Sequence, residues 1–269
     1  MKNIFIEGLQ GSGKSTLVSK LEEKLTPYKV YREGDISPVE LAWCSYVTTE
    51  QYDCIMRKYP QLQEELLKHT RSEGDKKIIA YTRVNSDIPE FYQYMEGFEI
   101  YNGRVDFATF QDIILSRYHA FNTTGNIFEC SLFQNSIESM MLYYQMEDDD
   151  ILNFYKEVYE IMKNKNIILL YLDSHSMIDD ILHIKKERSN EQGEELWFPL
   201  MMDYLKKSPY GTAHNYCEFE DLIHHMKRRR ELEHRIIREV MGEHVILLKA
   251  KNYELDAVIE SLSFVNSIE

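Results

Sequence analysis

The chain has 269 residues, which is enough for one large α/β domain or at most two small ones. Hydrophobic residues account for 43% and charged residues for 28%, as in a soluble globular protein, and no apolar run is long enough to cross a membrane. The formal net charge of −14 argues against a general nucleic-acid surface, which needs a basic stripe, although it leaves room for one local phosphate pocket.

Short apolar runs predict buried strands, and apolar residues at helical spacing predict amphipathic helices. The first strand is expected at residues 3–6, followed by a helix with Leu17, Leu21 and Leu25 on one face. Later strands are expected at 29–33, 76–84, 126–129, 167–172 and 245–248, and helices at 50–70 (broken at Pro60), 107–121, 136–144, 151–163, 177–188, 217–241 and 254–262. Because strands alternate with helices, the sequence predicts an α/β fold with a parallel sheet of about five strands flanked by helices on both faces.

The segment between the first strand and the first helix carries the most specific motif. Residues 8–15 read Gly-Leu-Gln-Gly-Ser-Gly-Lys-Ser and fit G-x-x-x-x-G-K-[ST], the Walker A pattern of a phosphate-binding loop (P-loop), at every fixed position. Glycines let the backbone turn its N–H groups toward an anion, and the following helix adds its positive dipole end. The strand–loop–helix context argues against a plain glycine-rich turn. The predicted nucleotide-binding residues are Gly8, Gly11, Ser12, Gly13, Lys14, Ser15 and Thr16.

Within this loop, Lys14 is expected to reach the β- and γ-phosphates of a nucleotide, and the Ser15 hydroxyl is expected to bind Mg²⁺. Ligands of parallel sheets sit at the carboxyl ends of the strands, so the residues after each strand are the next candidates. Glu33 and Asp35 follow the second strand. A kinase needs a carboxylate that orients the acceptor hydroxyl and accepts its proton, and Glu33 is predicted in that role, with Asp35 as a substitute. The alternative is a pair of solvated turn acids.

Two further acids end strands of the predicted sheet. Glu129 closes a buried strand, where a carboxylate is costly unless it is paired or bound to a metal. It is therefore expected to hold Mg²⁺ through water, to act as the catalytic base, or to form a structural ion pair. Asp173 is expected to cap the helix that follows it, together with Ser174 and Ser176.

A basic segment, Ile184-Lys185-Lys186-Glu187-Arg188, ends the helix after the fifth strand. Cations are favourable at any helix C-terminus, so a solvated helix end is one reading. The other is a lid whose cations, Arg188 above all, cover the transferring phosphoryl group. We expect a helical lid and insert at approximately 184–216 within a single P-loop kinase-like domain spanning 1–269. The second basic cluster, Arg228-Arg229-Arg230, is expected to balance Glu231 and Glu233 at helical spacing rather than to join the lid.

Several of these segments, in this order, resemble the deoxynucleoside kinase and thymidylate kinase group of P-loop kinases. They are the loop 8–16, Arg32-Glu33-Gly34-Asp35, Phe107-Ala108-Thr109-Phe110-Gln111 followed by Ser116-Arg117, Phe128-Glu129-Cys130-Ser131, and Tyr171-Leu172-Asp173 with 184–188. The resemblance covers roughly 1–262, with Cys130 at a position where those kinases carry an arginine. It implies ATP and Mg²⁺ as cofactors, a role for Gln111 and Arg117 in reading a nucleobase, and Asp35 as a substrate-binding acid. Arg83 and Tyr81 are further candidates for a pocket that holds a flat ring.

The predicted function is transfer of the γ-phosphate of ATP to a nucleoside or nucleotide-like acceptor, with Lys14, Glu33, Glu129 and Arg188 as catalytic residues. A kinase of another small hydroxyl compound and a P-loop NTPase that acts as a regulatory switch are the alternatives. The sequence lacks the N-K-x-D motif of GTPases, since Asn164-Lys165-Asn166 is followed by Ile167. The expected partner is a small-molecule acceptor, with no nucleic acid and no membrane, and the resemblance allows a homodimer.

Cysteine usage and the N-terminus bear on location. The four cysteines (Cys44, Cys54, Cys130 and Cys217) form no C-x-x-C pair, so neither a zinc site nor a disulfide framework is expected. The N-terminal segment lacks the apolar stretch and cleavage site of a signal peptide. A cytoplasmic, reducing location is therefore expected.

Overall fold

The computed structural model describes residues 1–174, 176–190 and 192–264. The chain divides into two compact units. The first unit comprises Met1–Val30 and Asn122–Glu269, and the second comprises Tyr31–Phe121. Each unit is described by itself, and the single kinase-like domain expected over 1–269 stays a prediction.

The first unit is built on a five-stranded parallel sheet with the strand order β2-β6-β1-β7-β8. Its central strand β1 pairs in parallel with β6 and β7, and β7 pairs in parallel with β8. The strands are largely apolar because helices cover both faces of the sheet. Their bounds are β1 (Asn3–Glu7), β2 (Lys29–Tyr31), β6 (Asn126–Glu129), β7 (Ile167–Asp173) and β8 (Val245–Lys249).

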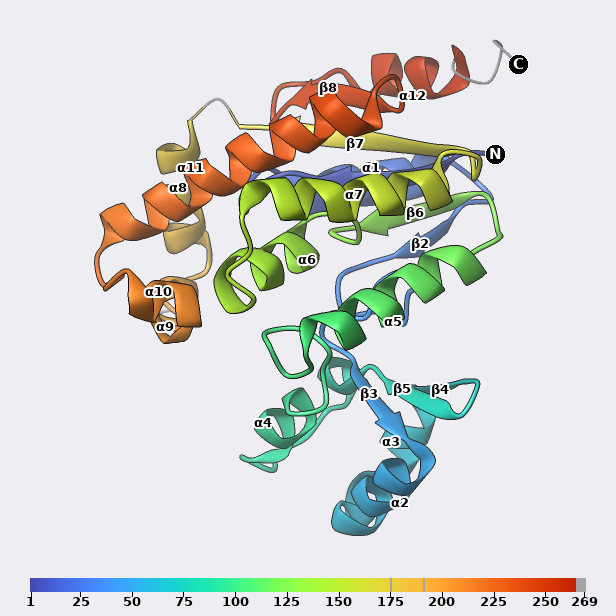
Figure 1. The fold of residues 1–269 in the computed structure, drawn as a ribbon, viewed down its shortest axis with the longest axis vertical. Coiled ribbons are helices and arrows are strands. Elements are labelled where there is room, and N and C mark those ends of the chain that lie inside the picture. Colours follow the sequence, from blue (N-terminus) through green and yellow to red (C-terminus); the bar gives the residue numbers. More distant parts are fainter. Residues whose placement is uncertain (175, 191, 265–269) are drawn as a thin grey trace. The chain divides into compact units, whose positions relative to one another are not determined.

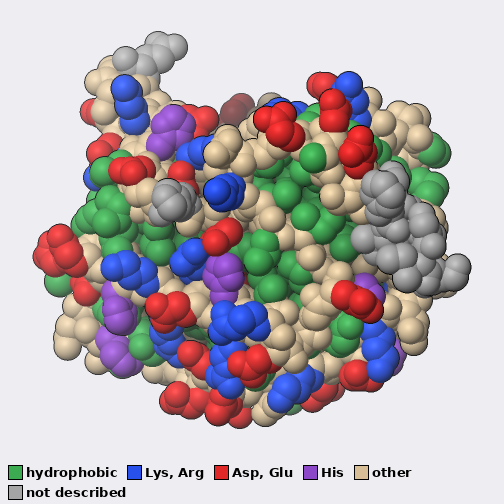
Figure 2. Space-filling view, turned by 90° about the horizontal axis from the view of Figure 1, so that it is seen from above, with side chains coloured by type: hydrophobic (Ala, Val, Ile, Leu, Met, Phe, Trp, Pro, Cys, Tyr) green, Lys and Arg blue, Asp and Glu red, His purple; other side chains and the backbone are tan. Residues whose placement is uncertain are grey.

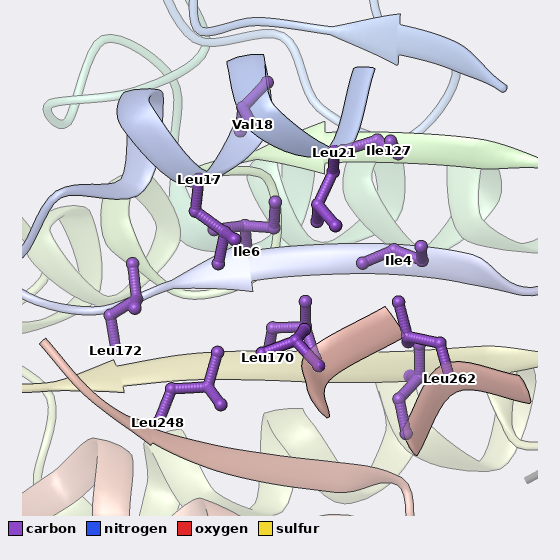
Figure 3. Close-up of a cluster of buried hydrophobic side chains, with 12 residues drawn as sticks. Ile4, Ile6, Leu17, Val18, Leu21, Ile127, Leu170, Leu172, Leu248 and Leu262 are labelled. Atoms are coloured by element: carbon purple, nitrogen blue, oxygen red, sulfur yellow. The ribbon is translucent and has the colours of Figure 1, made fainter. Parts of the chain in front are cut away.

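Helices α1 (Lys14–Lys24) and α12 (Leu255–Phe264) cover one face of this sheet. Side chains alternate between the two faces of a strand, so Ile4 and Ile6 of β1 point to the same face. There they join a buried apolar cluster shown in Figure 3. Its other members include Leu17, Val18, Leu21, Ile127, Leu170, Leu172, Leu248 and Leu262.

The opposite face of the sheet carries aromatic side chains. Phe5 of β1 stacks on Phe128 of β6, with the ring centroids 4.7 Å apart. Phe133 contacts both Tyr171 of β7 and Tyr155 of α7 (Asp148–Met162). The Tyr171 hydroxyl donates to Glu233 of α11 (Phe219–Ile236), so α7 and α11 lie over this face (Figure 1). A central parallel sheet with helices on both faces and a glycine-rich loop after its middle strand is the P-loop NTPase fold predicted from the sequence.

The remaining helical segments of the first unit follow β6 and β7. Helix α8 runs close to the predicted span 177–188. Of the expected lid at 184–216, residue 191 lies outside the described residues, and the rest contains the end of α8, then α9 and α10. Its action as a lid stays a prediction. The bounds are α6 (Gln134–Glu138), η3 (Ser139–Tyr143), α8 (Met177–Glu187), α9 (Trp197–Lys207), α10 (Pro209–Ala213) and η4 (Ile237–Met241).

The second unit contains a three-stranded antiparallel sheet with the order β3-β5-β4. The helical stretch 50–70 breaks at Pro60 as predicted, but its last residue begins β4. The strand expected at 76–84 ends at Ile79 and continues as a short 3₁₀ turn. β3, β4 and α4 were not predicted. The bounds are β3 (Ser45–Thr48), α2 (Thr49–Lys58), η1 (Pro60–Leu62), α3 (Gln63–Lys68), β4 (Thr70–Glu73), β5 (Lys76–Ile79), η2 (Tyr81–Arg83), α4 (Phe91–Glu96) and α5 (Phe107–Ala120).

The surface carries charge of both signs. Figure 2 shows one face of the molecule, on which Lys and Arg side chains are interleaved with Asp and Glu side chains rather than gathered into a continuous basic stripe. No helix in the described part of the chain combines the length and the apolar character needed to span a bilayer.

Candidate functional site

The loop between β1 and α1 has the backbone that its glycines predict. Gly8 and Gly11 have φ angles of 141° and 79°, which side-chain-bearing residues rarely adopt. A Cβ atom at Gly8 would lie 2.5 Å from the carbonyl oxygen of Leu172, and one at Gly11 would lie 2.7 Å from Cδ1 of Ile184. Both positions therefore require glycine, because the loop runs directly against β7 and α8.

The loop leads into an uncapped helix N-terminus. Gly13 is the N-cap of α1 in the left-handed conformation, and no side chain accepts a hydrogen bond at this cap. The first turn of α1 contains no acidic residue. The first backbone N–H groups of a helix have no intrahelical acceptor, and the helix dipole places positive charge there. This end of α1 is therefore suited to bind an anion.

Lys14 lies along the same loop. Its side chain is buried, and Nζ donates hydrogen bonds to the carbonyl oxygens of Gly8 at 2.7 Å and of Leu9 at 3.0 Å. The ammonium group is thus held against the backbone that the motif assigns to phosphate binding. Its positive charge adds to that of the helix N-terminus.

The two residues predicted to bind Mg²⁺ lie together. The Ser15 hydroxyl donates to Oε1 of Glu129 at 2.5 Å. The two meet because β6, which ends at Glu129, is the neighbour of β1 in the sheet. Hydroxyl and carboxylate oxygens are hard donors of the kind that Mg²⁺ prefers, so this pair fits the metal that the motif implies.

Ser12 is a buried residue of the loop. Its backbone N–H donates to the Leu9 carbonyl at 3.2 Å, within the loop. Its hydroxyl is fully buried beside Gly8 and has no hydrogen-bond partner in the described residues. The contact of Ser12 with a nucleotide stays a prediction.

Glu7 is a functional candidate that the sequence analysis missed. It is fully buried at the end of β1, directly before the loop. Its carboxylate accepts hydrogen bonds from the backbone N–H groups of Leu132 at 2.6 Å and Gln134 at 3.3 Å. Burial raises the pKa of Glu7 to about 7. Glu7 thereby ties the strand before the phosphate loop to the turn that follows Glu129.

Lys251 was also missed, although the strand-end rule points to its loop. It follows β8, and its Cγ lies 3.7 Å from the position of a Cβ atom on Gly13. Its Nζ forms an ion pair with Asp180 of α8 at 2.6 Å. Asp180 also accepts a hydrogen bond from Ser174 at 2.5 Å, and its carbonyl faces Gly11. The phosphate loop is thus flanked by α8 and by the segment after β8.

The cations at the end of α8 have different environments. Lys185 forms an ion pair with Glu195 at 3.3 Å, and its Nζ lies 3.9 Å from the ring centroid of Phe198. Arg188 is the exposed C-cap of α8, and its guanidinium forms no ion pair with any described residue. Of these two cations, Lys185 is engaged within its own segment, whereas Arg188 keeps its charge available.

Of the residues predicted to cap α8, Ser176 does so, whereas the prediction for Asp173 is wrong. Ser176 is the N-cap of α8 and accepts from the backbone N–H of Asp179 at 3.5 Å. The Asp173 carboxylate instead accepts hydrogen bonds from both Nε and Nη2 of Arg230, at 2.8 and 2.9 Å, and lies 3.0 Å from Nε2 of His234. These partners stand on α11, which passes the carboxyl end of β7.

Of the second basic cluster, only Arg229 pairs as predicted. It forms an ion pair with Glu233 at 2.7 Å, one helical turn away. Arg228 pairs instead with Asp148 of α7 at 2.7 Å, and Arg230 pairs with Asp173. Arg228 and Arg230 therefore join α11 to neighbouring elements, and Arg229 also does so through an ion pair with Glu138 of α6.

Within the second unit, three predicted site residues lie together. Arg83 forms an ion pair with Asp35 at 2.9 Å and donates to the backbone carbonyl of Glu33 at 3.3 Å. The indole Nε1 of Trp43 donates to Oε1 of Glu33 at 3.0 Å. Trp43 has a φ of 62°, which is unusual for a bulky residue, and was not among the predicted residues.

Gln111 and Arg117 both stand on α5 of the second unit. Gln111 is partly buried. Arg117 is buried, pairs with Glu73 and donates a hydrogen bond to the carbonyl of Ser37. These contacts hold the guanidinium of Arg117 within its own unit, and its role toward a substrate stays a prediction.

Comparison with known proteins adds little to this geometry. No family model matches the chain, and no curated protein matches it. Among solved structures, the chain is similar to a deoxyadenosine kinase from M. mycoides with bound dATP, at 15% identity and a TM-score of 0.33, with 99% of this chain and 100% of that chain covered. A likeness at this level is too distant for the neighbour's activity to be carried over to this chain.

Proposed function

We propose that this protein is an ATP- and Mg²⁺-dependent kinase that transfers the γ-phosphate of ATP to a small-molecule acceptor, with a nucleoside or nucleotide favoured. The observation that carries the proposal is the phosphate loop itself. It places the Lys14 ammonium, an uncapped helix N-terminus and the Ser15–Glu129 pair at the carboxyl end of a parallel sheet. Ligands of α/β sheets bind at this edge.

On the donor side, the N–H groups of the loop and of the first turn of α1 bind the phosphate oxygens. Lys14 exchanges its carbonyl partners in the loop for the β- and γ-phosphates, which are stronger acceptors because they are charged. Ser15 and Glu129 would hold Mg²⁺, which when bound would offset negative charge on the phosphates. The fit of this pair to a hard cation supports the assignment.

On the acceptor side, either Glu33 or Glu129 orients the acceptor hydroxyl and takes its proton. Asp35 and Arg83, which are paired in the second unit, are proposed to hold the acceptor together with Gln111 and Arg117. The preference for a nucleoside or nucleotide rests on the resemblance of the sequence segments to nucleoside and nucleotide kinases.

The test is ADP release from Mg-ATP in the presence of nucleosides, nucleoside monophosphates and unrelated hydroxyl compounds. We expect one acceptor class to stimulate ADP release strongly, and Lys14→Ala to reduce the stimulated rate by at least about a hundredfold, because the main charge at the transferring group is lost. A thermal unfolding curve of Lys14→Ala controls for folding. ADP release that needs no acceptor, yet is lost in Lys14→Ala, would contradict the kinase proposal and favour an NTPase switch.

A further inference from the structure

A group of buried charged side chains lies in the first unit beside the phosphate loop. We call it the buried charge cluster, and it consists of Glu7, Glu138, His225, Arg229 and Glu233. None of the five is more than 6% exposed. Burying charges is costly unless they are paired and hydrogen-bonded, so the partners of each group show what the cluster holds in place.

Arg229 stands at the centre of the buried charge cluster. Its Nε donates to Oε1 of Glu233 at 2.7 Å, and its Nη1 donates to Oε1 of Glu138 at 2.7 Å. The same Nη1 also donates to the side-chain oxygen of Gln10 at 3.1 Å. Gln10 occupies a variable position of the phosphate-loop motif, so this hydrogen bond joins α11 to the middle of the loop across 219 positions of sequence.

The two carboxylates that hold Arg229 are fixed by further contacts. Glu233 accepts a hydrogen bond from the Tyr171 hydroxyl of β7 at 2.7 Å. Glu138, at the end of α6, is bonded to Nε2 of His225 at 2.7 Å. Although burial alone would raise the pKa of Glu138, His225 and Arg229 lower it to about 2, so this carboxylate is ionised at neutral pH. The guanidinium is thus held by Glu138 of α6 and by Glu233 of α11, and Glu233 is in turn hydrogen-bonded to β7.

Charge pairing alone does not require the third contact of Arg229. Its two carboxylates already more than offset the charge of the guanidinium, yet Nη1 also donates to Gln10. A planar guanidinium offers several N–H groups in a fixed geometry, which a lysine ammonium cannot reproduce. An arginine here therefore does two things, since it neutralises buried acids and points a fixed donor at the loop.

We propose that Arg229 is a positioning residue that holds the phosphate loop through Gln10 in the conformation that receives the phosphate chain of a nucleotide. This inference rests on the proposed nucleotide binding. It assigns no contact between Arg229 and the nucleotide. Its consequence is that the Gln10–Arg229 hydrogen bond contributes to the affinity for phosphates and not to the affinity for the nucleoside.

The test uses the full chain with Gln10→Ala, which leaves the loop glycines, Lys14, Ser15 and the ion pairs of Arg229 unchanged. Dissociation constants are measured by isothermal titration calorimetry for Mg-ATP, Mg-ADP, AMP and adenosine. We expect Gln10→Ala to raise the dissociation constants for Mg-ATP and Mg-ADP by about tenfold. This is the effect expected for the loss of a hydrogen bond from a charged donor. The dissociation constant for adenosine should change by less than about twofold, because adenosine has no phosphate, and that for AMP, with one phosphate, should change less than that for Mg-ADP.

A second variant, Arg229→Lys, keeps the charge but removes the fixed donor. It should weaken the binding of Mg-ATP by a similar factor. The double variant Gln10→Ala with Arg229→Lys should bind Mg-ATP no more weakly than either single variant, because both substitutions remove the same hydrogen bond. Arg235→Lys on the same helix is the control, since Arg235 pairs with Asp149 and Glu239 away from the loop. Melting temperatures separate loss of affinity from loss of folding. If Arg229→Lys does not fold, the Gln10→Ala series alone decides.

The outcomes separate the two proposals. Unchanged Mg-ATP affinity in Gln10→Ala would overturn the role of Arg229 while leaving nucleotide binding intact. An equal loss of affinity for all four ligands would also overturn it. Such a result would indicate a general disturbance of the fold, which does not discriminate by phosphate number. A wild-type chain that binds neither Mg-ATP nor Mg-ADP would remove the proposed function and this inference together.

Discussion

At the scale of single residues, two buried acids, Glu7 and Glu129, lie beside the phosphate loop. Glu7 lies directly before the phosphate loop and accepts two backbone hydrogen bonds. Glu129 ends the neighbouring strand β6 and accepts a hydrogen bond from the Ser15 hydroxyl. Both acids end strands of the parallel sheet, where their backbone is held by pairing on β1 and β6. The positions of both acids therefore follow from the fold of the sheet.

The raised pKa of Glu7 predicts a pH-dependent stability. Its ordinary value of 4.5 becomes about 7 in the folded chain, so the folded state binds the proton more tightly than the unfolded state. The stabilisation is complete below about pH 4.5 and is lost as the pH rises through about 7. Glu7→Gln should therefore gain stability relative to the wild type between pH 5 and pH 8, by up to about 3 kcal/mol.

Denaturant unfolding of both proteins at these two pH values checks the prediction. The difference between the proteins is the quantity to compare, because burial also raises the pKa of Glu40 to about 8 and of Glu99 to about 7. These two acids affect both proteins equally. A difference that stays constant with pH would show that Glu7 is ionised in the folded chain throughout this range.

At the scale of elements, α8 ends at Arg188, the cation that the sequence analysis assigns above all others to the predicted lid. Arg188 ends this helix, and we expect it to act only when the phosphoryl group is transferred. Arg188→Ala should then lower kcat by about a hundredfold while changing the KM for ATP much less, because the lost contact forms mainly in the transition state. Steady-state kinetics with the stimulating acceptor measure both constants.

The matched control is Arg238→Ala, which removes another exposed arginine, in η4. Its kcat and KM should equal those of the wild type. Equal rises in KM for both variants, with kcat unchanged, would mean that the arginines act only through the overall charge of the protein. A kcat of Arg188→Ala equal to that of the wild type would remove the lid assignment.

Helix α2 of the second unit begins with a reciprocal cap. The Thr48 side chain accepts from the backbone N–H of Gln51 at 3.2 Å, and the Gln51 side chain accepts from the backbone N–H of Thr48 at 2.8 Å. Thr48→Ala should lower the free energy of unfolding by about 1 kcal/mol, whereas Thr48→Ser should keep most of it. Denaturant unfolding measures both. Equal losses would indicate that the threonine methyl group, not the cap, stabilises this end.

At the scale of the whole molecule, the sheet of the first unit could be predicted because its strands are continuous apolar runs. The sheet of the second unit could not be predicted in full, since β4 reads Thr-Arg-Ser-Glu and presents exposed side chains without an apolar pattern. The phosphate loop was predictable because its chemistry is local. The partners of Asp173 and Gln10 were not, because Arg230 and Arg229 lie 57 and 219 positions away and only the packing of α11 brings them close.

The tight fit of Gly11 against α8 has a consequence for how related sequences can vary. A carbon atom on residue 11 would meet Cδ1 and Cγ1 of Ile184, at 2.7 and 3.0 Å, and the backbone carbonyl oxygen of Asp180 at 3.1 Å. A smaller residue at 184 would relieve only the first two of these clashes, and the positive φ would remain. Position 11 is therefore expected to stay glycine during evolution even where residue 184 becomes smaller, because the Asp180 carbonyl and the positive φ each exclude a side chain there.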